Sequence, residues 1–273
     1  PVRIKSPVST VSLRARATGQ QNGAIDQFNV DAVSQCYDWD SATSTWIWRA
    51  TSNPASLFRY VLQHPANARP VPNSQIDLNK LAAWHDFCRR NGFEYNRYHD
   101  FTSSIFETLR DIAAAGRASV ARPDGKWSVV IDEPRTTIVQ HFSPRNSWGF
   151  RFSKKLPRLP HAWRVRFINE EQGYQSDERI VYADGYTEAN ATEFEVLELP
   201  GVTDPTQVWK LARYHYACAK LRPEEYEFYA DMEHIVCTRG DLIRVTHDVP
   251  LWGGASGRVK AVSGQVVTVD EPC

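Results

Sequence analysis

The feature that most constrains the fold is a change in hydrophobic period along the chain, from two residues to about 3.6 and back again. Early runs such as "TVSLRARA" and "STWIWRA" alternate apolar and polar residues, as half-buried strands do. From Asn53 to Gly116 apolar residues recur at helical spacing instead, and a hairpin signal then follows up to about residue 135. Alternating runs then return, including "WRVRFIN", "RIVYAD" and "EYEFYADMEHIV". The sequence therefore predicts an α+β fold in which strands predominate.

Start and stop signals mark the helices. Asn53-Pro54 offers a cap followed by a proline at the first helical position, and Ser104 with Glu107 forms a capping box. "ARPDGKW" has the composition of a tight hairpin turn with a glycine at positive φ. The helices are expected over residues 54–63, 77–91, 104–116 and 204–221.

These elements suggest three parts. Residues 1–52 and 136–236 form a β-rich domain with one long helix near 204–221. Residues 53–135, with three helices and a hairpin, form an α+β insertion into it. Residues 237–273 begin a small β-barrel that is cut short. Because the chain starts at Pro1 and stops just after a strand-like run, we expect it to be a fragment of a longer protein.

The charge composition makes two classes of binding partner, nucleic acids and anionic membranes, unexpected. The 273 residues contain 32 basic and 32 acidic side chains, so the formal net charge is zero. Nucleic-acid and anionic-membrane binders usually carry a basic excess, which is missing here. Five cysteines are scattered without a C-x-x-C pair, so we expect reduced, mostly buried thiols. They are Cys36, Cys88, Cys218, Cys237 and Cys273.

Candidate catalytic groups are few. Asp38 and Asp40 in "YDWDSAT" could in principle serve as the acid and base of a glycosidase, but an ordinary turn between strands explains them better. His85 and His215 lie on apolar faces of expected helices, which is typical of core or boundary imidazoles. The nine tryptophans could build a sugar-binding platform, yet their periodicity places most of them in the core. The sequence therefore assigns no catalytic, cofactor-binding or metal-binding residue, and no cofactor.

Three short motifs need separate interpretation. Gly253–Gly257 has the wrong spacing for a nucleophile elbow and reads as a loop. Asn190-Ala191-Thr192 matches a glycosylation acceptor, a pattern too short to carry weight alone. Arg239-Gly240-Asp241 matches an adhesion tripeptide, but it stands between two strand-like runs. We expect Gly240 to take a turn and Asp241 to bond local backbone, leaving Arg239 exposed.

Several segments, taken in order, resemble the central region of the tail tip attachment protein, or host specificity protein, of long-tailed bacteriophages. They are "SPVSTVSLRARA", "ATSNPASLFRYVLQHP", "LAAWHDFCRRNGFEYN", "IFETLRDIAAAGRASVARPDGKWSVVIDEP", "FSPRNSW", "ELPGVTDPTQVWKLARYHYA" and "CTRGDLIRVTHD". No single motif decides the resemblance, which rests on their collinear order over nearly the whole chain. One departure is Arg239, where the family usually has proline before glycine and aspartate.

The resemblance implies a baseplate-hub fold of small β-barrel domains with an inserted α+β subdomain. It also implies a structural role without an active site: a trimer that continues the tail tube and contacts other tail-tip and tail-tube proteins. Receptor recognition would belong to regions outside this chain, and no sequence-specific nucleic-acid binding is implied. The expected location is the virion tail tip, after assembly in the cytoplasm of the bacterial host.

Two other classes of function stay open from the residues. A carbohydrate-binding or adhesive module would show an exposed aromatic platform or an accessible Arg239-Gly240-Asp241 loop. A cell-wall-degrading tail enzyme would need Asp38 and Asp40, or another carboxylate pair, in a cleft at glycosidase separation. Nothing in the sequence favours the enzyme.

Overall fold

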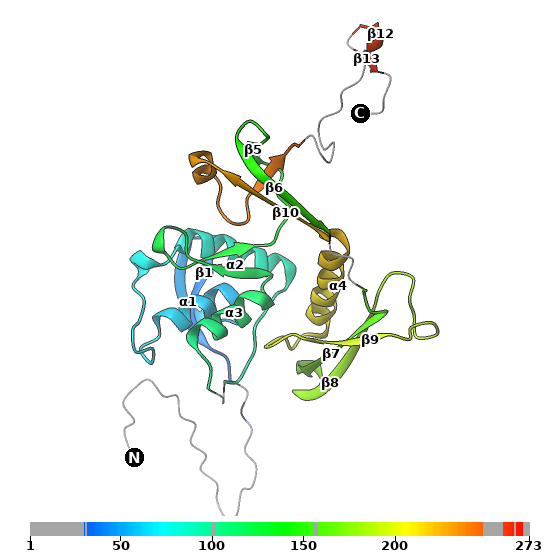
Figure 1. Cartoon of the computed structure of the whole chain (residues 1–273). Helices are drawn as coiled ribbons and strands as arrows, with labels where there is room; N and C mark the ends of the chain where they lie inside the picture. Colours follow the sequence, from blue (N-terminus) through cyan, green and yellow to red (C-terminus); the bar gives the residue numbers. More distant parts are fainter. Residues whose placement is uncertain are drawn as a thin grey trace, which may run out of the picture. The chain divides into compact units, whose positions relative to one another are not determined.

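The computed structural model describes residues 30, 32–99, 102–154, 158–247, 259–264 and 266–269. Within these ranges it contains four α-helices and thirteen strands, so the predicted α+β class is confirmed (Figure 1). The chain divides into two compact units. The first comprises residues 1–129, 168–175 and 199–207, and the second comprises 130–167, 176–198 and 208–273. The three-part division expected from the sequence stays a prediction.

The first unit opens with an antiparallel pair of strands, β1 (Gln35–Asp40) and β2 (Thr45–Ala50). Three helices follow in the order expected: α1 (Pro54–Gln63), α2 (Leu78–Asn91) and α3 (Ile105–Ala115). Their colours run from blue to green in Figure 1, where they lie together beside β1.

Local capping explains why these helices begin and end where they do. The Asn53 side chain accepts a hydrogen bond from the backbone N–H of Ala55, and the proline at the first position of α1 has no N–H to satisfy. Gly92 ends α2 in the left-handed region, at φ 66°. The capping box at Ser104 is fully formed, with both reciprocal bonds to Glu107. These predictions from sequence are confirmed.

The helices pack around Trp84, which is fully buried. Its ring meets Phe58 edge-on, with centroids 5.8 Å apart, and its Nε1 donates to the carbonyl of Gly116 at 2.9 Å. A Cβ at residue 116 would lie 2.7 Å from this ring, so only glycine fits there. Leu81, Leu109 and Ile112 complete the core between the three helices.

A hairpin follows α3 at the expected place. Strands β3 (Ala118–Ala121) and β4 (Ser128–Ile131) pair across the short 3₁₀ turn η2 (Pro123–Gly125). Asp124 and Gly125 both have positive φ, as the sequence Asp-Gly indicates. Two further 3₁₀ turns in the first unit are η1 (Asn73–Gln75) and η3 (Glu170–Gln172).

A buried glutamine joins the segment at 199–207 to the rest of the first unit. The Gln207 side chain is fully buried, and its Oε1 accepts from the backbone N–H of Glu94 at 3.0 Å. Its Nε2 donates to the carbonyls of Glu94 and Ala115, at 3.0 and 3.1 Å. The amide thus satisfies backbone groups from two separate segments, which fixes their positions.

The second unit consists of small sheets. Strands β5 (Ile138–Phe142) and β11 (Leu242–Val245) are parallel, and β6 (Ser147–Lys154) and β10 (Glu224–Ala230) are antiparallel. A three-stranded sheet has the order β8-β7-β9. Its strands are β7 (Ala162–Asn169), β8 (Gln175–Tyr182) and β9 (Phe194–Glu198). The remaining elements are α4 (Pro205–Leu221), the 3₁₀ segment η4 (Met232–Val236), and the paired strands β12 (Val259–Ser263) and β13 (Val266–Val269).

Two expectations change here. The run at 225–236 does not stay a strand: β10 ends at Ala230, and the Asp231 side chain accepts from the N–H of Met232, which starts η4. In the described ranges each sheet has only two or three strands and none closes, so the barrel-like hub domains stay a prediction. The expected opening strand "TVSLRARA" lies outside the described residues.

Candidate functional site

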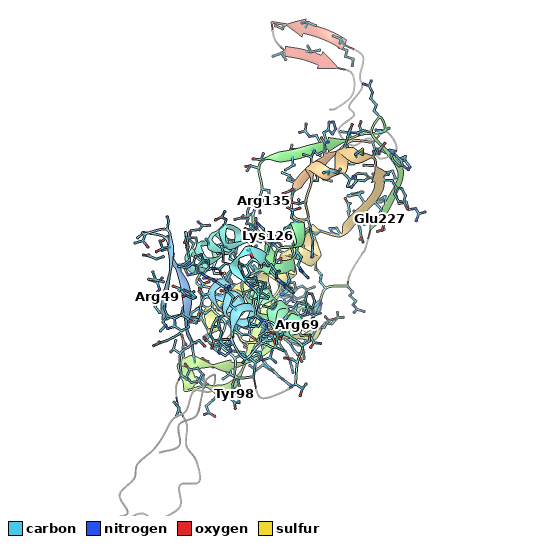
Figure 2. The ribbon with its side chains drawn as sticks, turned by 90° about the vertical axis from the view of Figure 1, so that its left-hand side faces the viewer. Arg49, Arg69, Tyr98, Lys126, Arg135 and Glu227 are labelled. Carbon is cyan, nitrogen blue, oxygen red and sulfur yellow. The ribbon has the colours of Figure 1, made fainter. Side chains whose placement is uncertain are left out.

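The main polar cluster of the first unit surrounds Asp38, which is only 3% exposed. Its Oδ1 accepts three hydrogen bonds: from Ser56 Oγ at 2.6 Å, Thr51 Oγ1 at 2.9 Å and His85 Nε2 at 2.9 Å. Its Oδ2 accepts from Arg49 Nε at 2.5 Å. Figure 2 labels Arg49 beside its strand. One carboxylate therefore ties together β1, β2, α1 and α2.

These bonds keep Asp38 ionised. Burial by itself would raise the pKa of the carboxyl, but the hydrogen bonds from His85, Ser56 and Thr51 outweigh that effect and hold the pKa well below its usual range. Ser56 and His85 bond to the same carboxylate oxygen. In a nucleophile–base relay, the histidine would instead stand between the hydroxyl and the carboxylate. The geometry suits a structural junction between elements.

Asp40 has a different role, although it lies two residues away on the same strand. It is partly exposed at the end of β1, where its carboxylate accepts from Thr43 Oγ1 at 2.7 Å and from the backbone N–H of Ala42 at 3.3 Å. The turn that the sequence predicted after Asp40 is confirmed. Asp38 is no part of that turn, because it lies in β1 and its side chain reaches the helices.

The Arg239-Gly240-Asp241 tripeptide forms the turn expected for it. Gly240 has φ +98°, and a Cβ there would lie 2.4 Å from Cγ1 of Val130. Oδ2 of Asp241 accepts from the backbone N–H and the hydroxyl of Thr238, at 2.8 and 2.9 Å. The aspartate carboxylate is thus bonded within its own turn, while Arg239 is exposed.

The other sequence candidates are dispersed. His85 is buried beside Asp38, as expected for a core imidazole, but His215 is exposed on α4 and the inward placement expected for it was wrong. The Asn190 amide is engaged in a local turn, with Oδ1 accepting from Thr187 N at 2.6 Å. Gly253–Gly257 lies outside the described residues. In the described ranges, no helix is long and apolar enough to span a bilayer, and no three metal-binding side chains gather as a cation site.

The thiols follow the expected pattern in part. Cys36 and Cys88 are buried in the first unit, whereas Cys218 and Cys237 are partly exposed in the second, and all four are free. Burial, with the nearby charge of Asp38, raises the pKa of the Cys36 thiol to about 12. Burial also raises the pKa of Cys88. Cys273 lies outside the described residues.

A surface of stacked aromatic rings lies on the β6–β10 pair of the second unit. Trp148 is opposite Tyr229 and Phe152 is opposite Tyr226 in the strand register. The ring centroids of these pairs are 6.4 and 5.3 Å apart, and Phe150 stacks on Tyr226 at 6.1 Å. Trp148, Phe152 and Tyr229 are 57%, 51% and 60% exposed. These five side chains are called the aromatic face below.

Adjacent segments of the same chain pack around this face. Gly149 has φ +66°, and a Cβ there would lie 2.7 Å from the Tyr229 ring, so the glycine lets that ring lie against the strand. Directly after β10, η4 exposes the apolar side chains of Met232, Ile235 and Val236. Asn146 donates to Glu233 at 2.6 Å, which holds η4 next to the start of β6. Exposed apolar groups therefore gather in this part of the second unit.

Among solved structures, the chain is similar to a tail protein from Neisseria meningitidis MC58. The sequences are 11% identical, and the likeness covers 56% of this chain and 48% of that chain with a TM-score of 0.43. This chain thus matches about half the length of that protein. Comparisons with family models and with curated proteins give no match.

The structure corrects the expectation for the tryptophans. Of the eight that lie in described positions, Trp84 is buried, whereas Trp48, Trp148 and Trp209 are exposed. Strand periodicity showed which side chains share a face, but a two-stranded sheet has no further layer to cover that face. The alternating rings in "SWGFRFSK" and "EYEFYA" were the available signal for the aromatic face.

Proposed function

We propose that the chain is a structural subunit of a bacteriophage or prophage tail tip. In this proposal it forms part of a trimeric hub that continues the tail tube, contacts other tail-tip proteins and carries host-recognition regions beyond this chain. It would be assembled in the bacterial cytoplasm and remain in the virion. Its role would be mechanical, with no enzymatic step.

The observation that carries this proposal is the collinear order of segments that resemble the tail tip attachment family. Three of those segments correspond to discrete structural elements here, namely α1, α2 and the block of α3 with its hairpin. The aromatic face supports the same conclusion, because assembly subunits keep apolar surface for their neighbours. The most prominent buried carboxylate, Asp38, is bonded on both oxygens by the chain itself.

A carbohydrate-binding module is the second candidate, since Trp148 and Tyr229 are more than half exposed. A sugar platform presents ring faces to the ligand. Here the interplanar angles of the cross-strand pairs are 25° and 18°, at centroid separations that correspond to rings stacked on one another. Offset-stacked rings leave each other less free ring face for a sugar, which favours a protein contact.

Antibody labelling of purified phage particles tests the proposal. Gold label against this chain should lie at the distal end of the tail, and particles made without the gene should lack a finished tip. Arg239→Pro should restore infectivity in full, because the proposed role makes no use of that side chain. Absence of the chain from purified particles would overturn the proposal, and loss of host adsorption with Arg239→Pro would favour the adhesive alternative.

A further inference from the structure

The β6–β10 pair is a two-stranded sheet in the described part of the chain, so each strand keeps one open edge. An open edge presents unpaired backbone groups that another strand can join. Two-stranded sheets are also marginally stable unless something packs on them. The open edges and the low stability of a two-stranded sheet therefore both favour pairing with a further strand.

The side chains of the pair are complementary across the strands. Phe152 lies opposite Tyr226 on the aromatic side, and Arg151 lies opposite Glu227 on the other side. Arg151 and Glu227, the latter labelled in Figure 2, are both exposed, and no ion pair is formed by either within the described residues. Their charges are available to a neighbouring strand as well.

The two strands differ strongly in charge. β6 carries Arg151 and Lys154, whereas β10 carries three glutamates, at positions 224, 225 and 227. If β6 met β6 of another copy, basic side chains would face basic ones, and two β10 strands would bring acidic side chains together. Only a β6 edge against a β10 edge repeats the opposite-charge and ring-on-ring pairs already present inside the sheet.

We propose that the open edge of β6 in one copy of the chain pairs with the open edge of β10 in a second copy. This head-to-tail contact joins two different surfaces, so it closes into a ring rather than a two-fold dimer when its rotation permits. The aromatic face then continues from copy to copy. The inference rests on the proposed function, since it supplies the surface for self-association of the hub.

The exposed area suggests a contact of moderate strength. An aromatic side chain covers about 150–250 Å² in full. Trp148, Phe152 and Tyr229, each about half exposed, thus offer roughly 300 Å² between them. A stable interface needs about 800 Å² per partner. Association of the chain alone should therefore depend on concentration.

Sedimentation of the 273-residue chain over a concentration series tests the contact. The unaltered chain should gain mass as concentration rises. Arg151→Glu and Glu227→Arg each put like charges opposite one another between copies, so each alone should associate at least about tenfold more weakly. An equal mixture of the two variants should regain association between unlike chains, because Glu at 151 then meets Arg at 227 of the other chain. A closed ring of three would still contain one contact between two copies of the same variant, so pairs of unlike chains are the species to measure.

The mixture excludes an effect on folding, because each chain in it still has like charges opposite each other inside its own sheet. Arg166→Glu is the matched control: Arg166 is also an exposed arginine that faces a glutamate, but it lies on β7, the central strand of its sheet. That variant should associate normally.

An unaltered chain that stays monomeric throughout, or a mixture that fails to regain association, would overturn the inference. Labelling at the tail tip by a chain that does not self-associate would leave the proposed function standing without this contact. Self-association by a chain that is absent from the particles would support the contact and overturn the proposed function.

Discussion

Replacing Asp38 by asparagine tests whether this carboxylate holds the first unit together. The amide oxygen of asparagine can keep the bonds from Ser56, Thr51 and His85, which all reach Oδ1. Its NH₂ group then faces Arg49, and the charge-assisted bond at Oδ2 is lost. Such a bond contributes about 1.5–3 kcal/mol. Since the Arg49 side chain is 44% exposed, water compensates for part of this bond, and the expected loss of unfolding free energy is about 1–2 kcal/mol.

The loss should depend on pH in a defined direction. The folded-state pKa of Asp38 is depressed, and the unfolded value is about 3.9. The stabilisation is therefore complete above the unfolded value and disappears as the pH falls through the folded one. Urea unfolding followed by circular dichroism should show the full difference between the two proteins near neutral pH, and a shrinking difference below about pH 4.

Asp40→Asn is the control, because Asp40 is partly exposed, bonds only within its own turn, and can be replaced there by asparagine. It should change stability by less than about 0.5 kcal/mol. The interpretation of Asp38 as a junction is refuted if both variants lose the same small amount of stability. It is also refuted if the Asp38→Asn difference stays constant from neutral to acid pH.

Two further substitutions should have local effects of predictable size, both measurable by urea unfolding. Gly240→Ala should cost about 1–3 kcal/mol, because φ is +98° and the new Cβ meets Val130, whereas Arg239→Ala should be neutral within about 0.5 kcal/mol. Equal effects of the two would contradict the turn. Gln207→Leu should lower the free energy of unfolding by about 3 kcal/mol, because it leaves backbone groups of Glu94 and Ala115 without their hydrogen-bond partner. An unchanged free energy of unfolding for Gln207→Leu would contradict this role of the amide, because water would then satisfy the same backbone groups.

The helices could be predicted closely because their limits depend on a few neighbouring residues. Asn53, Gly92 and Ser104 act through bonds to backbone two to four positions away, so their effect is readable in the sequence. The turns at Asp124 and Gly240 were predictable for the same reason, since a positive φ restricts the residue type locally.

The long-range features could not be predicted in the same way. Asp38 meets Ser56 and His85 only because β1, α1 and α2 pack together, over separations of 18 and 47 residues. The exposed positions of Trp48 and Trp148 depend on how many strands join each sheet, which periodicity does not specify. The end of β10 depended on one competing bond, from Met232 to the Asp231 side chain.

The distribution of the free thiols gives the two units separate chemical reporters. Cys36 and Cys88 are buried, with pKa values so far above neutrality that almost no thiolate exists in the folded first unit. An alkylating reagent can modify them only when that unit opens. Cys218 and Cys237 are partly exposed in the second unit, so they become modified earlier. Mass spectrometry of briefly alkylated chain therefore measures how often the first unit opens, without any engineered label.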